Sequence, residues 1–181
     1  MSEIDLLILG LGNVLYGDDG LGVIAIDLLE QRYDIPEGAH VADGGTLGLS
    51  LLPLLQQSRQ VLIVDAIRCP GRAPGNLVRL RGDEVAPAVR DRLSPHQVGV
   101  ADLLDAAHLL GGNPSTVTLL GLVPEAMEWS VARSRSVDGG IDMLLNAIVH
   151  EVQDYGYQMV AKSAPAVRDR AVHHHARHFG M

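Results

Sequence analysis

Short apolar runs alternate along this chain with longer segments in which apolar residues recur every three or four positions. Apolar runs at Ile4–Gly10, Ala39–Asp43 and Val61–Asp65 each end in turn-forming or acidic residues, which is typical of buried parallel strands. Val117–Leu122 has the same character, whereas Asn76–Leu80 alternates apolar and polar residues. The first four runs therefore predict interior strands, and the fifth predicts an edge strand.

Segments of helical periodicity fill the spaces between these runs. We predict helices at Gly20–Arg32, Leu47–Gln57, Val100–Leu110 and Asp138–Tyr155. A regular alternation of strand and helix is typical of a doubly wound sheet. The predicted fold is a single-domain α/β three-layer sandwich, built on a mostly parallel, five-stranded twisted sheet with one antiparallel edge strand.

The periodic pattern ends near Tyr157, which sets the predicted limits of the domain. Residues 1–157 are expected to form the one domain, and residues 158–181 a loosely structured, His-rich tail that ends in HHHARHFGM. A length of 181 residues suits one hydrophobic core. Because 47% of residues are hydrophobic but only 3% aromatic, we expect that core to consist of Leu, Val, Ile and Ala.

Charge and cysteine content narrow the classes of partner and compartment. The 22 acidic residues outnumber the 14 basic ones, and a net charge of −8 argues against nucleic acid as a partner. Cys69 is the only cysteine, so no internal disulfide forms, which is compatible with a reducing cytosol. The segment MSEIDLLILG carries acids where a signal peptide carries bases, and its apolar run is shorter than the roughly 20 residues of a spanning helix. We therefore expect a cytoplasmic protein without membrane association, and we take a monomer as the default oligomeric state.

Acidic residues follow three of the predicted strands. Asp18 and Asp19 lie in the Gly-rich loop after the first strand, Asp43 ends the second, and Asp65 ends the third. In an open parallel sheet, functional groups gather in the crevice at the carboxyl ends of the strands. We therefore expect these acids to lie along one edge of the sheet.

His96 adds an imidazole in the loop before the helix predicted from Val100. If the sheet is wound as predicted, Asp19, Asp65 and His96 converge, and one imidazole with two carboxylates suits a borderline divalent metal. Because the set has no thiolate, we expect open coordination positions and a visiting metal. A magnesium-dependent phosphotransfer domain is an alternative, since paired acids also suit an octahedral oxygen site. His96 favours metals that accept imidazole.

Each of these features also has an ordinary structural explanation. Asp18 can cap the helix that begins near Gly20, and acids in Gly-rich loops often only form turns. His96 alone can be a solvated loop residue. Asp65 is harder to explain in this way, because a buried carboxylate needs a partner. The helical segment His150–Asp154 lacks the second histidine of a zinc-protease motif, so we expect a solvated helix face there.

Four motifs occur in a fixed order between residues 4 and 155. They are Gly12-Asn13-x-Leu15-x-x-Asp18-Asp19-Gly20-x-Gly22, Asp43-Gly44-Gly45-Thr46, Asp65-Ala66 and Ser94-Pro95-His96-Gln97. Each motif is weak alone, but the ordered set is specific. In this order and spacing the motifs resemble those of the NiFe-hydrogenase maturation endopeptidases.

This resemblance implies a nickel-recognising endopeptidase and assigns roles to its residues. Such an enzyme removes the C-terminal extension of a hydrogenase large-subunit precursor after nickel insertion. Carried over by motif, Asp19, Asp65 and His96 are the nickel ligands, and Asp43 with the glycines after it takes part in cleavage or substrate recognition. Some members have Glu as the first ligand, one methylene longer than Asp19, so Asp18 stays open as an alternative. The nickel is expected to arrive with the substrate.

The residues around His96 also bear on the type of hydrogenase. Ser-Pro-His-Gln followed by Val98-Gly99-Val100-Ala101-Asp102-Leu103 most resembles the members that serve uptake, membrane-bound hydrogenases. The expected partner is the large-subunit precursor of such an enzyme. A nickel-delivery or scaffold protein that binds the precursor without cutting it is the alternative from another functional class.

Overall fold

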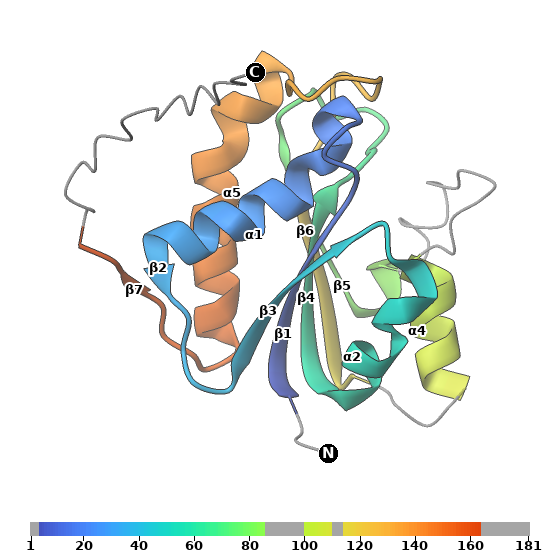
Figure 1. The fold of residues 1–181 in the computed structure, drawn as a ribbon, viewed down its shortest axis with the longest axis vertical. Coiled ribbons are helices and arrows are strands. Elements are labelled where there is room, and N and C mark those ends of the chain that lie inside the picture. The colour runs from blue at the N-terminus through green and yellow to red at the C-terminus, as the bar shows by residue number, and fades with distance from the viewer. Residues whose placement is uncertain (1–3, 86–99, 110–113, 164–181) are drawn as a thin grey trace, which may run out of the picture.

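The computed structural model describes residues 4–85, 100–109 and 114–163 of the chain, and its centre is a five-stranded sheet (Figure 1). The strand order is β3-β1-β4-β6-β5. The first four of these strands are mutually parallel, and β5 pairs antiparallel with β6 at one edge. The bounds are β1 Ile4–Leu11, β3 Ala39–Gly45, β4 Ser58–Ala66, β5 Leu77–Arg81 and β6 Thr116–Leu122. All five predicted strands are present, and β5 is the antiparallel edge strand.

Helices cover both faces of the sheet. On one face lie α1 (Leu21–Arg32) and α5 (Arg135–Asp154), and on the other α2 (Leu52–Gln57) and α4 (Val100–Leu109) (Figure 1). This confirms the predicted three-layer α/β sandwich. The segment predicted as one helix from Leu47 divides into a 3-10 turn, η2 (Gly48–Leu51), followed by α2. Two further 3-10 turns are η1 (Gly17–Gly20) and η3 (Gly82–Glu84).

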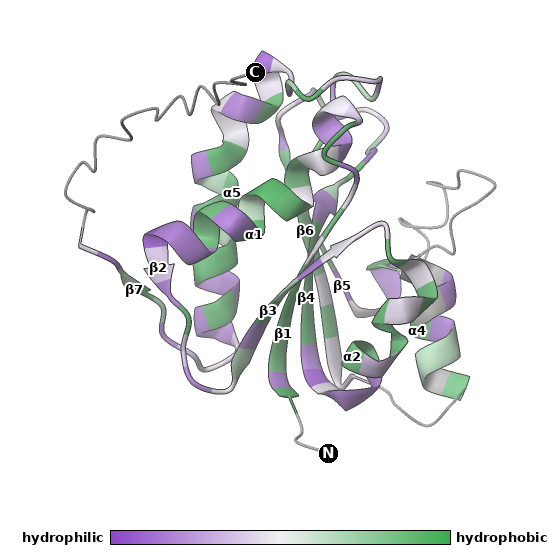
Figure 2. Cartoon of the chain, viewed as in Figure 1, coloured by the Kyte–Doolittle hydropathy of each residue, from purple (hydrophilic) through white to green (hydrophobic). Residues whose placement is uncertain are grey.

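The central strands are buried on both faces, which explains their continuous apolar sequence. Leu6 and Ile8 of β1 pack toward α1 and α5, whereas Leu7 and Leu9 pack toward α2 and α4. At most 1% of each side chain is exposed. Burial of one such side chain contributes about 1.5–3 kcal/mol. Figure 2 shows the consequence, because the central strands are mainly hydrophobic while α1 and α5 alternate hydrophobic and hydrophilic positions.

Two short strands lie outside the sequence prediction. β2 (Tyr33–Asp34) pairs antiparallel with β7 (Val160–Ala161), and the Lys162 backbone N–H donates to the carbonyl of Arg32 at 2.8 Å. Two-residue strands carry no periodic signal, so sequence patterning does not reveal them. The described chain thus continues in contact with the domain beyond residue 157, where the boundary was placed. That boundary stays a prediction, and the tail from residue 164 lies outside the described residues.

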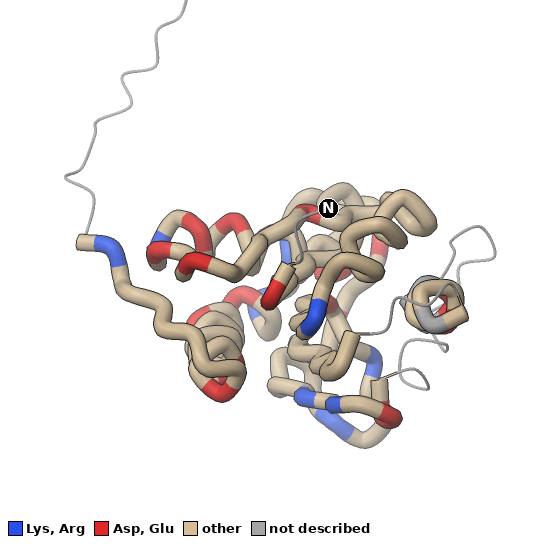
Figure 3. Tube along the Cα trace, turned by 90° about the horizontal axis from the view of Figure 1, so that it is seen from below, with Lys and Arg blue, Asp and Glu red and all other residues tan. Residues whose placement is uncertain are grey.

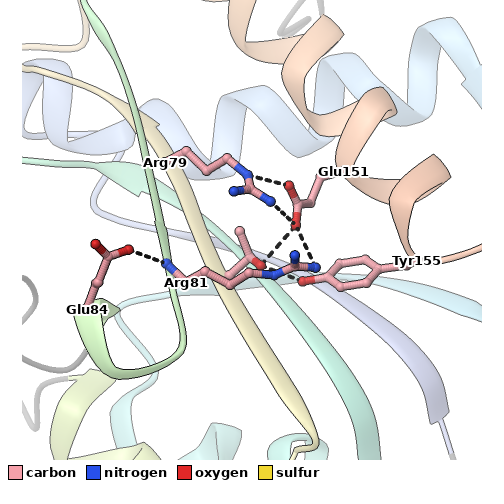
Figure 4. A network of polar contacts seen from close by, with 6 residues as sticks. Arg79, Arg81, Glu84, Glu151 and Tyr155 are labelled. Carbon is pink, nitrogen blue, oxygen red and sulfur yellow. Dashed lines mark hydrogen bonds and ion pairs between the residues drawn. The ribbon is translucent and has the colours of Figure 1, made fainter.

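A buried ion-pair network joins α5 to β5 and β6 (Figure 4). Glu151 is 3% exposed, and its carboxylate accepts hydrogen bonds from the Arg79 guanidinium at 2.7 and 3.2 Å and from the Thr118 hydroxyl at 3.0 Å. Arg81 lies 3.6 Å from Glu151, and the Tyr155 hydroxyl donates to Thr118 at 2.6 Å. The expected solvated helix face is therefore wrong at Glu151. Its carboxylate is a structural partner for two arginines of the edge strand.

Charged residues are distributed unevenly over the outside of the sandwich. Seen from below, several basic positions gather in the lower part of the trace, and acidic positions are more frequent toward the left (Figure 3). Strand β5 and the loop before it carry Arg68, Arg72, Arg79 and Arg81. Within the described ranges, no helix has the length and apolar character needed to cross a membrane.

Candidate functional site

The carboxyl ends of β3, β1 and β4 lie side by side and carry two of the predicted acids. Gly10 of β1 pairs with Asp43 of β3 on one side and with Val64 of β4 on the other. Asp65 directly follows Val64, so the two acids flank the end of β1. Because neighbouring strands are about 5 Å apart, their backbones are separated by roughly 10 Å.

Asp19 reaches the same edge through the turn η1, which connects β1 to α1. η1 packs against β4. Gly22, at the start of α1, lies so close to β4 that a Cβ on it would be 2.1 Å from the Val64 carbonyl oxygen. Only glycine permits this approach. The backbone N–H of Asn13 donates to Asp19 Oδ2 at 2.8 Å and so orients the carboxylate. Asp19 is half-buried beside the end of β4.

Asp65 is the buried acid of the candidate site, with 3% of its side chain exposed. Its Oδ1 accepts a hydrogen bond from the Ala66 backbone N–H at 2.7 Å. Side chains alternate along a strand, and Ile63 packs on the α2 and α4 face, so Asp65 belongs to that face as well. On the neighbouring strand Gly121 pairs with Asp65, and a Cβ at Gly121 would lie 1.8 Å from the Asp65 carbonyl oxygen. Glycine at this position lets β6 pass close to Asp65.

Asp43 is exposed and differs from Asp65 in its orientation. Val41 packs on the α1 and α5 face, and alternation along β3 assigns Asp43 to the same face. The next residue, Gly44, faces the other side, where a Cβ would lie 2.6 Å from Leu11 Cδ2. The structure thus brings Asp43 to the predicted edge, but on the face of the sheet opposite to Asp65.

His96, the third predicted metal ligand, lies outside the described residues. Helix α4 begins at Val100, four residues later in the sequence, and covers the face to which Asp65 belongs. In the described part of the chain, no group of three His, Cys, Asp or Glu side chains is arranged to hold a metal ion. Asp19 and Asp65 are therefore brought to one edge, and the complete set of three ligands stays a prediction.

Asp18 is a buried structural carboxylate. Its Oδ2 accepts hydrogen bonds from the backbone N–H groups of Glu125 and Ala126 at 2.8 and 2.9 Å, and its Oδ1 accepts one from Ser134 at 2.7 Å. Burial acts to raise the pKa of Asp18, but the three backbone donors outweigh it and hold the pKa below its ordinary value of 3.8. Asp18 does not cap the helix near its own position, since it binds a distant loop. Of the two adjacent acids, Asp19 is the one partly open to solvent.

The loop that Asp18 holds, residues 123–134, was not identified from the sequence. Its hydrogen bonds to Asp18 span 107 to 116 positions, and backbone donors have no side-chain signature. With the end of β4 the loop forms a pocket of about 430 Å³. The pocket is lined by Arg68, Cys69, Pro70, Val123, Pro124, Glu125 and Met127. It begins three residues beyond Asp65, and the Arg68 guanidinium contacts the Met127 sulfur at 3.6 Å.

Comparison with known proteins identifies relatives of this chain. Residues 23–151 match the family model HycI, described as hydrogenase maturation protease. The chain is 35% identical over 159 residues to the hydrogenase 2 maturation protease of Escherichia coli, covering 88% of this chain and 97% of that protein. It is 36% identical over 166 residues to the hydrogenase expression/formation protein HupD of Rhodobacter capsulatus, covering 90% and 78%.

A solved structure agrees with these sequence matches. The hydrogenase maturating endopeptidase HybD of Escherichia coli superposes with a TM-score of 0.82 at 34% identity, over 87% of this chain and 98% of that one. The family model covers Asp43, Asp65 and His96 and begins after Asp19. The fold and most of the candidate site therefore lie within the shared region.

Proposed function

Because this chain belongs to the hydrogenase maturation protease family, we propose that it removes the C-terminal extension of a NiFe-hydrogenase large-subunit precursor once nickel has been inserted. It is an endopeptidase, and maturation proteases act on large-subunit precursors. The observation that carries the proposal for the site is that η1, which contains Asp19, packs against β4, whose carboxyl end carries Asp65. Both acids come from the motifs that resemble the family.

Nickel belongs to the substrate in this proposal. The carboxylates of Asp19 and Asp65, with the imidazole of His96, form a mixed oxygen and nitrogen set that suits a borderline divalent ion. Asn13 fixes the Asp19 carboxylate, and the covered sheet fixes Asp65, so both groups are preorganised. When these groups complete the coordination of a nickel ion held by the precursor, the scissile bond takes a defined position. Binding is thereby converted into positional accuracy at the bond to be cut.

Asp43 has a different role in this proposal. It is exposed and belongs to the sheet face opposite to Asp65, so we assign it to recognition of the precursor, together with Gly44 and Gly45. Asp43→Asn would then raise the KM for the precursor and leave kcat nearly unchanged. A fall in kcat with an unchanged KM would instead make Asp43 a group that acts in the cleavage step.

The test of the ligand set is the processing of a nickel-loaded cognate precursor, followed by intact mass. Asp19→Ala, Asp65→Asn and His96→Ala are expected to abolish the loss of mass from the C-terminus, with unfolding midpoints that show a retained fold. Asp27→Asn, an exposed acid on α1, is the matched control and should process normally. Substantial processing by the His96 variant would remove His96 from the set.

The nickel checkpoint has its own test. A nickel-free precursor should remain uncut under conditions in which the loaded precursor is processed, and efficient cleavage of the nickel-free form would contradict the checkpoint. A stable complex without any change in mass would favour the scaffold or delivery function.

The type of hydrogenase, the compartment and the oligomeric state are parts of the same proposal. The residues around His96 support a precursor of the uptake, membrane-bound type, because they most resemble the members that serve such hydrogenases. We propose that processing takes place in the cytoplasm and that the protease acts as a monomer. Parallel assays with precursors of different hydrogenase types would test the first point, and light scattering would test the last.

A further inference from the structure

Exposed apolar side chains gather at the edge of the sheet that carries the acids. Nine large hydrophobic residues of the described chain are exposed, and six of them lie in the segments that follow β1, β3 and β6. These six are Val14, Leu15, Leu47, Leu49, Trp129 and Val131. Single exposed apolar residues are ordinary, but a group of them at one place is typical of an interaction site.

Three members of this group lie on two adjacent loops. Leu15, Trp129 and Val131 are 53%, 79% and 76% exposed, and we call them the apolar loop surface. The Ser130 backbone N–H donates to the Leu15 carbonyl at 3.1 Å, which places the two loops side by side. The ring of Tyr16 meets that of Trp129 edge-on, with centroids 5.6 Å apart. Trp129 is thus held beside the loop that leads into Asp19.

The apolar loop surface rests on a fixed support. Asp18 holds the underlying loop through its three backbone hydrogen bonds, and the Gly17 N–H donates to the Ser130 carbonyl at 2.7 Å. A partner that binds a preorganised loop does not have to pay the entropy of ordering it. Tryptophan is also one of the residue types that are enriched among the few residues that dominate the binding energy of an interface.

We propose that the apolar loop surface is the docking site for the hydrogenase large-subunit precursor, which it contacts through apolar side chains near the scissile bond. This inference rests on the proposed function. Its basis is continuity with the candidate site, because Leu15 precedes Asp19 by four residues. The loop that carries Trp129 also lines the pocket next to the end of β4. A precursor whose nickel is held by Asp19 and Asp65 therefore lies next to this surface.

Charge gives a second reason for an apolar contact. The protein has a net charge of −8, and its candidate site consists of carboxylates. If this negatively charged protein bound its precursor mainly through charge, the affinity would depend on the charge of the precursor and on salt. Apolar contact supplies affinity that is insensitive to salt, so binding through this surface should persist at high ionic strength.

The experiment compares variants of the surface with exposed apolar residues elsewhere. KM and kcat for the nickel-loaded precursor are measured by intact mass, and Kd by interferometry on the same proteins. Trp129→Ala is expected to raise KM and Kd at least about tenfold and Val131→Ser about threefold, with kcat within about twofold of wild type. Leu109→Ala on α4 and Met143→Ala on α5 are the matched controls, and both should behave as wild type.

Further measurements separate docking from other roles of Trp129. Trp129→Phe keeps a ring against Tyr16 and should recover much of the affinity. An unfolding midpoint of Trp129→Ala close to that of wild type would distinguish loss of docking from collapse of the loop. Trp129 is the only tryptophan, so 5-fluorotryptophan labelling gives one ¹⁹F resonance that should shift when the precursor binds.

The outcomes distinguish the docking surface from the proposed function. Wild-type KM and Kd in both Trp129→Ala and Val131→Ser, with an active wild-type enzyme, would overturn the docking surface and leave the protease function intact. If the wild-type protein binds the precursor without cutting it, the proposed function fails, and the Kd values of the same variants still decide the docking surface. A wild-type dimer that Trp129→Ala converts to a monomer would assign the surface to a second copy of the chain and overturn the inference.

Discussion

Replacement of Asp18 by asparagine tests whether a single buried carboxylate holds the loop at residues 123–134. Asparagine has nearly the same shape, but only one of its two terminal atoms accepts hydrogen bonds. It can satisfy the N–H groups of Glu125 and Ala126 through its carbonyl, and it then turns an amide donor toward the Ser134 N–H. One of the three hydrogen bonds to the charged carboxylate is lost, and the other two become hydrogen bonds to a neutral carbonyl oxygen.

The magnitude follows from these three bonds. A hydrogen bond to a charged group contributes about 1.5–3 kcal/mol, and a neutral one about 0.5–1.5 kcal/mol. Loss of one bond to the charged acceptor (about 1.5–3 kcal/mol) and weakening of the other two (about 1–1.5 kcal/mol each) predict that Asp18→Asn lowers the free energy of unfolding by about 3.5–6 kcal/mol. With a urea m-value of about 2 kcal/mol/M, the urea midpoint should fall by about 2–3 M. Asp27→Asn, an exposed acid on α1, should change stability by less than about 0.5 kcal/mol.

The pH dependence of this difference gives the prediction a second readout. Because the pKa of Asp18 is lowered in the folded protein, its charge contributes stability above the unfolded value of 3.8, and this stability is lost as the pH falls through the lower folded pKa. The difference between wild type and Asp18→Asn should therefore be constant between about pH 7 and 5 and shrink below pH 3.8. Urea unfolding at pH 7, 5, 4 and 3 measures it. Equal midpoints at pH 7, or a difference that grows on acidification, would refute the assigned role.

Four further substitutions test the packing and the polar network by urea unfolding. Gly139→Ala on α5 places its Cβ in open space and should stabilise by up to about 1 kcal/mol, whereas Gly140→Ala meets Leu122 Cδ1 at 2.7 Å and should destabilise by about 1–3 kcal/mol. Equal effects of the two would contradict the packing of α5 on β6. Glu151→Gln weakens a buried ion pair and should cost about 2–4 kcal/mol, so a neutral result would show that the arginines find other partners. Tyr155→Phe removes one buried hydrogen bond, with an expected cost of about 1 kcal/mol, and no loss would leave that bond without a net contribution.

Local patterns in the sequence were sufficient for the sheet and the helices around it. Runs such as Val61–Val64 are apolar throughout because helices cover both faces, and that requirement is visible in the strand itself. The acids at the carboxyl ends follow from the same reasoning, since parallel strands end at a common edge. The alternating pattern of β5 likewise identified the edge strand, although β2 and β7 were too short to carry a pattern.

The polar partners could not be predicted in the same way. Asp18 and Asp19 are adjacent and chemically identical, yet one is fully buried against a loop more than 100 positions away and the other is half exposed beside β4. The sequence predicted that Glu151 belongs to a solvated helix face, but in the structure it is paired with two arginines of β5. In each case the partner is distant in sequence, and a carboxylate has no local signal that tells where it will be bound.

By itself the sequence determined the five strands of the main sheet, the helices around it, the edge at which the acids lie and, through its ordered motifs, the family. Those properties depend on periodicity and on residue order, which are local and can be read along the chain. The tertiary structure alone decided which acid is structural, that Asp43 and Asp65 belong to opposite faces, and that Leu15 meets the loop carrying Trp129. These properties depend on which distant segments pack together, because burial and hydrogen bonding are set by neighbours in space.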